Sequence, residues 1–227
     1  MDARTAVNDG GIALVSDVFS RGEASTLVRK LDSNSLHRSR AGIRHLMSND
    51  GVAEVARSPR MMTIARSILG NEAFPFRATL FDKSSESNWL VVWHQDTALP
   101  LRTRSATPGW GPWSVKDGIN YAHAPTRALE QVVALRLHLD DSTEQNGPLR
   151  VFRGTHTLGV LSDEQVEKLS REIPADDCVA STGSVLVMRP LVIHSSSKSQ
   201  NGSLRRVLHI EYAASGFVGD GLELAIA

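Results

Sequence analysis

From residue 74 onwards the chain carries short segments that are rich in β-branched and aromatic residues and are bounded by Gly, Pro, Asn, Asp or Ser. The segments are 74–81, 88–94, 131–139, 148–152, 184–188, 191–194 and 205–212. Short apolar runs with turn-forming residues between them are typical of β-strands joined by tight connections. This pattern restricts the chain to a mainly β architecture, such as a sandwich or an open barrel.

The residues before 74 follow a helical pattern after one short apolar strand at 11–15. Ser20 and Glu23 have the spacing of a capping box, in which the two side chains satisfy free amides at the start of a helix. Pro59 suits the first position of a second helix, and Gly70 suits its exit. We therefore expect helices that flank the strands.

Residues 97–127 follow neither the helical nor the strand period and contain several prolines and glycines together with two tryptophans. A loop of this length inside a compact domain is usually a functional lid or disordered, and the tryptophans argue against disorder. We predict a lid loop over this stretch. Because no linker or repeat divides the chain, we expect one domain over 1–227, with a helical part over 1–72 and a barrel over 74–215.

The charge and cysteine content exclude several classes of protein. Lys plus Arg and Asp plus Glu each number 25, so the formal net charge is zero, which argues against a general nucleic-acid binder and against a polybasic membrane-surface protein. The single cysteine, Cys178, can build neither a disulfide framework nor a cysteine zinc site. With no secretory leader or membrane span visible, we expect a cytoplasmic protein, monomeric or homodimeric, whose partner is a small-molecule substrate.

One pair of side chains at the end of an apolar strand has the spacing of metal ligands. His94 and Asp96 are two residues apart, so they lie on the same face of a strand and could chelate one cation. Such a pair is also typical of a surface that binds nothing. His194, which ends the segment 191–194, is the best candidate for a third ligand, and two histidines with one carboxylate make the facial triad of non-haem Fe(II) oxygenases.

A carboxylate-binding residue follows the third candidate ligand. Arg205 comes eleven residues after His194 and opens the next strand, where a planar guanidinium suits bidentate binding of a carboxylate. This order of residues, together with NGPLRVFRGTH at 146–156, resembles the phytanoyl-CoA dioxygenase family of Fe(II)/2-oxoglutarate-dependent oxygenases. The resemblance extends from the strand at 11–15 to about residue 212, with Arg153 where the family usually has proline.

The resemblance implies a fold and an activity. The fold is mainly β with flanking helices, namely a double-stranded β-helix (jelly-roll or cupin-like) barrel with the N-terminal helices packed on one sheet. The activity is that of a hydroxylase of the EC 1.14.11 type, a dioxygenase that uses Fe(II), 2-oxoglutarate and O2 and releases succinate and CO2. It would act on an unactivated C–H bond of a small organic substrate, anionic compounds being among the candidates. Asp96 implies hydroxylation rather than halogenation, because halogenating relatives replace that carboxylate with a small residue.

The resemblance also assigns residues to the metal and to the cosubstrate. His94, Asp96 and His194 would bind iron, and Arg205 would bind the distal carboxylate of 2-oxoglutarate. Ser196 matches a position where the family often places a hydroxyl on the same carboxylate, although a solvated serine-rich loop is an equally good interpretation.

Further polar residues on the strands are candidates for the pockets of the barrel. Arg136 lies on the strand that lines the cosubstrate pocket in the family, and a solvent-facing position is equally compatible with the sequence. The candidates for the substrate pocket are Arg77, Thr79, Trp113, His138 and His209. For Arg77 and Thr79 the alternative is an edge strand whose polar face is exposed to solvent. For Trp113 the alternative is an aromatic anchor in a solvated loop.

Two other functions remain compatible with the residues. One is a cupin-like metalloenzyme that does not use 2-oxoglutarate, and the other is a non-catalytic β-sandwich protein that binds a small molecule. Arg205 discriminates, because the first of these alternatives gains support if this side chain does not face the metal.

Overall fold

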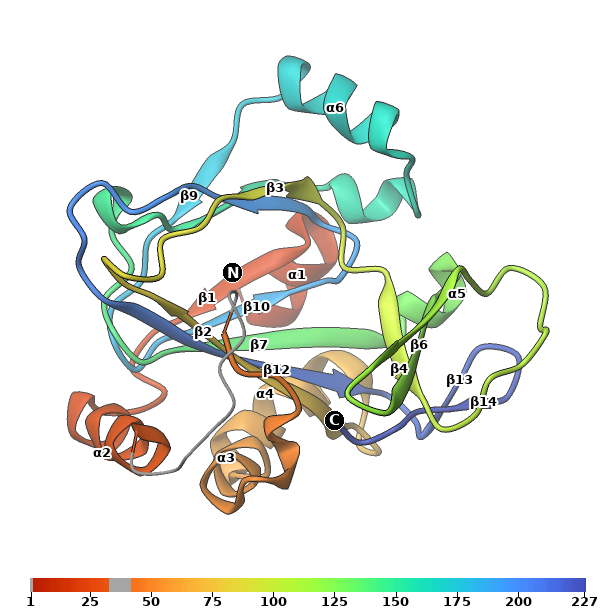
Figure 1. Ribbon diagram of the computed structural model, residues 1–227, viewed down its shortest axis with the longest axis horizontal. Helices are drawn as coiled ribbons and strands as arrows, with labels where there is room; N and C mark the ends of the chain where they lie inside the picture. The colour runs from red at the N-terminus through yellow and green to blue at the C-terminus, as the bar shows by residue number, and fades with distance from the viewer. Residues whose placement is uncertain (1, 33–41) are drawn as a thin grey trace.

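Two antiparallel sheets form the body of the protein (Figure 1). The computed structural model describes residues 2–32 and 42–227. The larger sheet has the order β1-β10-β7-β12-β2, and the smaller sheet has the order β3-β11-β8-β9. The strands of the larger sheet are β1 (Ile12–Val15), β10 (Val185–Met188), β7 (Val132–His138), β12 (Arg205–Ala213) and β2 (Phe74–Lys83). Those of the smaller sheet are β3 (Val91–His94), β11 (Ile193–Ser196), β8 (Leu149–Phe152) and β9 (Asp176–Cys178).

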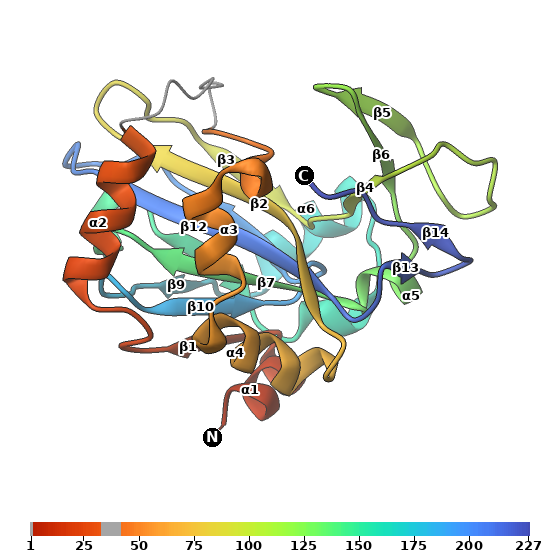
Figure 2. The same ribbon diagram turned by 90° about the horizontal axis from the view of Figure 1, so that it is seen from below.

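The smaller sheet lies across one face of the larger sheet, and N-terminal helices cover the opposite face (Figures 1 and 2). The helices are α1 (Ala3–Gly10), α2 (Arg21–Asp32), α3 (Asp50–Ala56), α4 (Pro59–Leu69), the short α5 (Thr126–Leu129), and α6 (Asp163–Glu172), which packs on the smaller sheet. This arrangement is a double-stranded β-helix, which confirms the predicted fold class. Within the described ranges the two sheets share no ladder, so the predicted barrel is an open sandwich rather than a closed cylinder.

Side-chain alternation along the larger sheet separates an apolar face from a polar one. On the outer face, Leu135, Leu208 and Ile210 are fully buried against the helices. On the inner face, which points toward the smaller sheet, the strand registers bring together Arg77, Thr79, Lys83, Arg136, His138, Arg205, His209 and Glu211. Burying so many polar groups is costly unless they bind one another or a ligand. The interior of the sandwich is therefore where a functional site is expected.

The sequence pattern predicts most of these elements. Each of the seven predicted segments overlaps an observed strand. The capping box is confirmed, because the Ser20 hydroxyl accepts from the Glu23 amide at 3.2 Å and the Glu23 carboxylate accepts from the Ser20 amide at 2.8 Å. Helix α4 begins at Pro59 and ends at Leu69, directly before Gly70. Helices α1 and α3 were not predicted, since they span only eight and seven residues and show too little apolar period.

The stretch 97–127 is not the loop that the sequence pattern predicts. It forms a separate three-stranded sheet beside the main sandwich (Figure 1), made of β4 (Ala98–Leu101), β6 (Ile119–His123) and β5 (Trp113–Lys116). Strands β4 and β5 are four residues each and β4 contains Pro100, so their alternation is too short to detect. The prediction of a structureless segment was wrong, whereas its role as a lid stays a prediction.

The C-terminal segment completes this side of the molecule. Strands β13 (Phe217–Val218) and β14 (Leu222–Glu223) pair with each other, and Leu224 forms a bridge with Leu101 of β4. Among the described residues, every helix is too short or too polar to span a lipid bilayer.

Candidate metal centre and substrate cavity

The facing register of two strands places the predicted metal ligands together. In the smaller sheet His94 of β3 pairs directly with His194 of β11, and the two imidazole centroids are 4.2 Å apart. Asp96 follows β3, with its carboxylate oxygens 3.6 Å from His94 Nε2 and 3.5 Å from His194 Nε2. One donor atom from each of these three residues lies within 4.8 Å of the others, a spacing that suits a single metal ion.

Backbone contacts set the donor atoms of both imidazoles. His94 Nδ1 lies 2.8 Å from the Val92 carbonyl and His194 Nδ1 lies 2.9 Å from the Val192 carbonyl. A carbonyl can only accept, so each Nδ1 carries the proton and each Nε2 keeps a lone pair directed toward Asp96. This is the second-shell arrangement typical of metal-binding histidines.

The protonation states also suit a metal. Burial lowers the pKa of His194 to about 4, so its ring is neutral near pH 7. Burial would raise the pKa of Asp96, but the neighbouring imidazoles of His194 and His94 outweigh it and hold that pKa well below its usual value. Burial would lower the pKa of His94, but its contact with the Asp96 carboxylate outweighs burial and raises that pKa, so a metal ion would bind this ring in competition with a proton. Two imidazole nitrogens and one carboxylate with no thiolate make a donor set that fits ferrous iron.

A second polar cluster joins β2, β11 and β12. Lys83 Nζ donates to Ser196 Oγ at 2.9 Å, and Arg205 Nη2 donates to the same oxygen at 3.1 Å. Ser196 in turn donates to the Gly147 carbonyl at 2.9 Å. All three side chains are buried, and within the described chain neither cation has a carboxylate partner. Two buried cations beside one hydroxyl make a site for an anion that carries several oxygen acceptors.

The remaining cations of the inner face extend this cluster. Arg136 Nη1 lies 2.9 Å from His209 Nδ1. Buried nitrogens without a partner remain on three residues of the described chain near this point: Arg136 Nε, Arg205 Nε and both ring nitrogens of His138. Burial and then the Arg205 charge lower the pKa of Lys83 to about 7. Burying unpaired donors and like charges close together costs free energy. This region is therefore suited to bind a negatively charged ligand, which would offset that cost.

A cavity of about 580 Å³ opens beside the candidate metal ligands. It is lined by His94 and Asp96 and by three of the predicted pocket residues, namely Arg77, Thr79 and His209. The other residues that line it include Arg44, Phe81, Trp89, Lys116 and Tyr121. The Arg77 guanidinium forms an ion pair with the Glu211 carboxylate and donates to the Ala98 carbonyl at 2.9 Å.

Two of the predicted pocket residues lie elsewhere. Trp113 pairs with Ala122 between β5 and β6 and packs against the apolar cluster around Leu99, so it is not part of the cavity wall. His138 is buried next to Arg136 and Arg205, beside the cation cluster of the inner face rather than along the cavity. Burial and then those two arginines lower its pKa to about 3, so its ring is neutral.

Lys83 is the main residue of the cation cluster that was not predicted. It has the same parity on β2 as Arg77 and Thr79, and it pairs with Arg205 across the sheet. That parity is the signal that marks it, because every second residue of a strand faces the same side.

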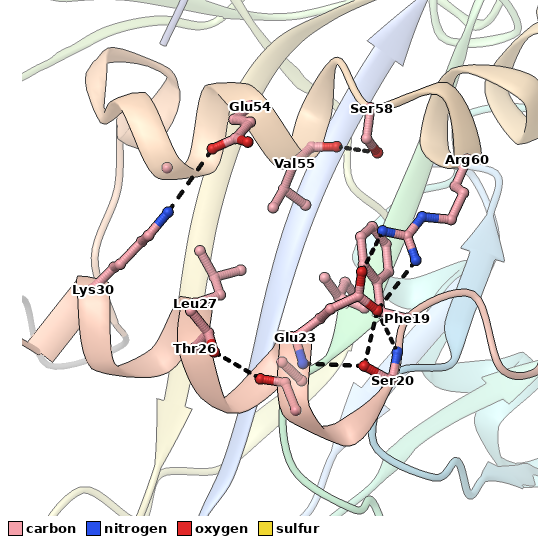
Figure 3. Close-up of a pocket in the computed structure, with 14 residues that line it drawn as sticks. Phe19, Ser20, Glu23, Thr26, Leu27, Lys30, Glu54, Val55, Ser58 and Arg60 are labelled. Carbon is pink, nitrogen blue, oxygen red and sulfur yellow. Dashed lines mark hydrogen bonds and ion pairs between the residues drawn. The ribbon is translucent and has the colours of Figure 1, made fainter.

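A different cavity of about 450 Å³ lies on the outer side, between α2 on one side and α3 with the start of α4 on the other (Figure 3). Its polar side chains already bind one another: Arg60 donates to both carboxylate oxygens of Glu23, at 2.6 and 3.2 Å, and Lys30 lies 3.9 Å from Glu54. These contacts stabilise the packing of the helices and leave no converging group for chemistry, so the inner cavity is the better functional candidate.

Comparisons with known proteins identify a family and similar folds. The pattern of the phytanoyl-CoA dioxygenase family matches residues 37–207. L-proline trans-4-hydroxylase of Streptomyces griseoviridis is 23% identical over 186 residues, which are 70% of this chain and 62% of the hydroxylase, so the chain spans less than two thirds of that relative. EctD of S. alaskensis has a TM-score of 0.72 at 18% identity, covering 99% of this chain and 81% of EctD. HygX of Streptomyces hygroscopicus, solved with nickel and 2-oxoglutarate, has a TM-score of 0.69 at 15% identity, covering 95% and 87%.

Proposed function

The chain belongs to the phytanoyl-CoA dioxygenase family, and from this we propose that it is an Fe(II)- and 2-oxoglutarate-dependent dioxygenase that hydroxylates an unactivated C–H bond of a small organic substrate. The observation that carries the proposal is the convergence of His94, Asp96 and His194 beside a buried, unmatched cation cluster. With 2-oxoglutarate and O2, the bound iron supplies the oxidation of the C–H bond, and succinate and CO2 are released.

The metal ligands would occupy one face of the iron and leave the other face for cosubstrate and O2. His94 and His194 would bind through Nε2, because their Nδ1 protons are held by backbone carbonyls. The carboxylate of Asp96 fills the position that halogenating relatives leave open for halide, which supports hydroxylation.

The cation cluster would hold the distal carboxylate of 2-oxoglutarate. Arg205 and Lys83 supply the positive charge, and Ser196 lies between them as a donor or acceptor. Arg136, further along the inner face, would offset the remaining negative charge of the dianion. A metalloenzyme that does not use 2-oxoglutarate has no need for these buried cations, so the burial of Arg205 on the inner face argues against that alternative.

The substrate would enter through the 580 Å³ cavity. Strands β5 and β6 of the predicted lid stretch contribute Lys116 and Tyr121 to its wall, so this small sheet would help to exclude water. The proline hydroxylase relative acts on L-proline, and a substrate of about that size is the first to test here. The buried, unpaired Cys178 supports a reducing cytoplasmic setting.

Anaerobic reconstitution with Fe(II), followed by iron analysis and a succinate assay with L-proline and other small substrates, tests the proposal. We expect wild type to bind one iron and to convert 2-oxoglutarate to succinate. His94→Ala should lose the iron, whereas Glu164→Gln, an exposed position on α6, should keep it. Retention of iron by His94→Ala, or no succinate from the iron-loaded wild type, would contradict the proposal.

A further inference from the structure

The cavity beside the metal ligands carries positive charge that neither iron nor 2-oxoglutarate accounts for. Arg44, Arg77 and Lys116 line the same cavity as His94 and Asp96, and they come from three separate parts of the chain. Arg44 precedes a 3₁₀ turn at Leu46–Ser48, Arg77 belongs to β2, and Lys116 ends β5. Cations that converge from distant segments on one cavity are typical of a binding site for an anion.

Nearby acids neutralise one of these cations but not the other two. Arg77 is paired with Glu211 on the inner face. Asp117, beside Lys116 in sequence, is directed to His45, with its carboxylate 3.5 Å from His45 Nδ1. Within the described ranges Arg44 and Lys116 have no acidic partner closer than 4 Å, so both charges are available to a ligand in the cavity.

The aromatic ring of Tyr121 contacts two of these three cations. Lys116 Nζ lies 4.8 Å from the ring centroid, and the Arg77 guanidinium lies 5.8 Å from it. The Tyr121 hydroxyl is 2.8 Å from His45 Nε2, and the side chain is buried. Because His45 is itself oriented by Asp117, the ring is fixed on both sides and Lys116 rests on its face.

Another part of the cavity wall is apolar. Trp89, Leu90 and Val92 line it, and the last two expose 58% and 68% of their surface. Contiguous exposed apolar side chains that line a groove are among the features that mark ligand-binding sites. The wall is therefore amphipathic, with cations on one part and an apolar patch on another.

Once iron and 2-oxoglutarate are bound, two positive charges of the site would still lack a negative partner. The two negative charges of 2-oxoglutarate would be met by Arg205, Lys83 and Arg136, and Asp96 would be met by the metal. Arg44 and Lys116 remain, and a single arginine fork beside a lysine suits one planar carboxylate.

We propose that the substrate is a carboxylic acid whose carboxylate binds between Arg44 and Lys116 while its body lies along Trp89, Leu90 and Val92 and its reacting carbon faces the metal ligands. This inference rests on the proposed function and adds the chemical class of the substrate to it. Arg44, Lys116 and Tyr121 are then specificity-determining residues rather than catalytic ones.

Calorimetric titration of the protein loaded anaerobically with Fe(II) and 2-oxoglutarate tests the inference. The probes are three acids and their primary amides: L-proline with L-prolinamide, hexanoate with hexanamide, and phenylacetate with phenylacetamide. We expect at least one acid to bind, and its amide to bind about tenfold or more weakly, as befits a charge-assisted contact. The double variant Arg44→Gln, Lys116→Gln should bind the acid no better than wild type binds the amide.

Arg66→Gln, Lys168→Gln is the matched control, because it removes the same two charges from exposed positions on α4 and α6. It should bind the acid as wild type does, and both double variants should keep wild-type affinity for Fe(II) and 2-oxoglutarate. An amide that binds as tightly as its acid, an unchanged acid affinity in the double variant, or no binding of any acid would overturn the inference. Failure to bind Fe(II) or 2-oxoglutarate would instead refute the proposed function itself.

Discussion

At the residue scale, side-chain parity explains why much of the site could be predicted. Arg77, Thr79 and His209 were proposed as pocket residues because they alternate with apolar neighbours, and all three line the cavity. The pairing of His94 with His194 depends on which strands become neighbours in the smaller sheet, which spacing along the chain does not reveal. Arg44 could not be predicted, since it lies outside any periodic segment and reaches the cavity only through the tertiary fold.

We expect the buried Lys83 to make the affinity for 2-oxoglutarate depend on pH. Burial and the Arg205 charge lower its pKa to about 7 in the protein without cosubstrate, and a bound dianion favours the charged form and raises that pKa. Below pH 7 the amine is already charged and the affinity is constant. Above pH 7 binding must take up a proton, so we expect the Kd for 2-oxoglutarate to rise up to about tenfold per pH unit.

Lys83→Met tests this dependence with a side chain of similar length and no charge. Titrations between about pH 6.5 and 8.5 at saturating Fe(II) should give a Kd that is weaker than wild type at low pH and nearly independent of pH. If the variant shows the same rise as wild type, another group is responsible and Lys83 does not contact the cosubstrate.

At the element scale, the turn before β8 lies against the proposed cosubstrate pocket. Gly147 has φ +70°, and a Cβ there would lie 2.3 Å from the Ser197 carbonyl and 3.2 Å from Lys83 Nζ. Steric contact therefore explains why the motif at 146–156 has glycine at this position, because only glycine lets the turn approach the segment that carries Ser196.

Gly147→Ala should weaken 2-oxoglutarate binding by displacing Lys83 and the Ser196 segment. Gly221→Ala is the matched control, because Gly221 has φ +72° and nothing within 4 Å of the added Cβ. Gly221→Ala should lose about 1–2 kcal/mol of stability from the left-handed backbone. Gly147→Ala should lose more, because its Cβ also clashes with the Ser197 carbonyl, and only this variant should raise the Kd for 2-oxoglutarate at temperatures where both are folded. Equal Kd values would show that this turn does not shape the pocket.

The strands of the 97–127 stretch could not be predicted from the periodicity of the sequence. Short strands such as β4 and β5 pair with β6 away from the main sandwich. Strand β4 is buried and forms a bridge with the C-terminal segment, whereas β5 is mostly exposed. A period needs several residues on one buried face to be visible, and these strands do not have them. Tyr121 and Lys116 are placed in the cavity by this small sheet, so they were not predicted as a pair.

At the scale of the whole molecule, the two faces of the larger sheet have separate roles. The outer face and the helices form the apolar core, whereas the inner face holds the buried charges that we propose to bind ligands. Leu135→Ala, a fully buried position on the outer face, should lower the free energy of unfolding by about 2–5 kcal/mol. It should leave iron affinity unchanged at temperatures where the variant is folded.

Denaturant unfolding checks this division, with Leu14→Ala as control because Leu14 is 45% exposed. The control should change the free energy of unfolding by no more than about 0.5 kcal/mol. A similar loss in both variants, or a loss of iron affinity in folded Leu135→Ala, would mean that core and site are not separable.

The central claim is that His94, Asp96 and His194 hold iron beside a pocket for 2-oxoglutarate. The most direct test is anaerobic titration of the protein with Fe(II) and then with 2-oxoglutarate, followed by visible absorption spectroscopy. The account predicts a charge-transfer band that needs both ligands and is absent in His94→Ala. No band with both ligands present in wild type would contradict it.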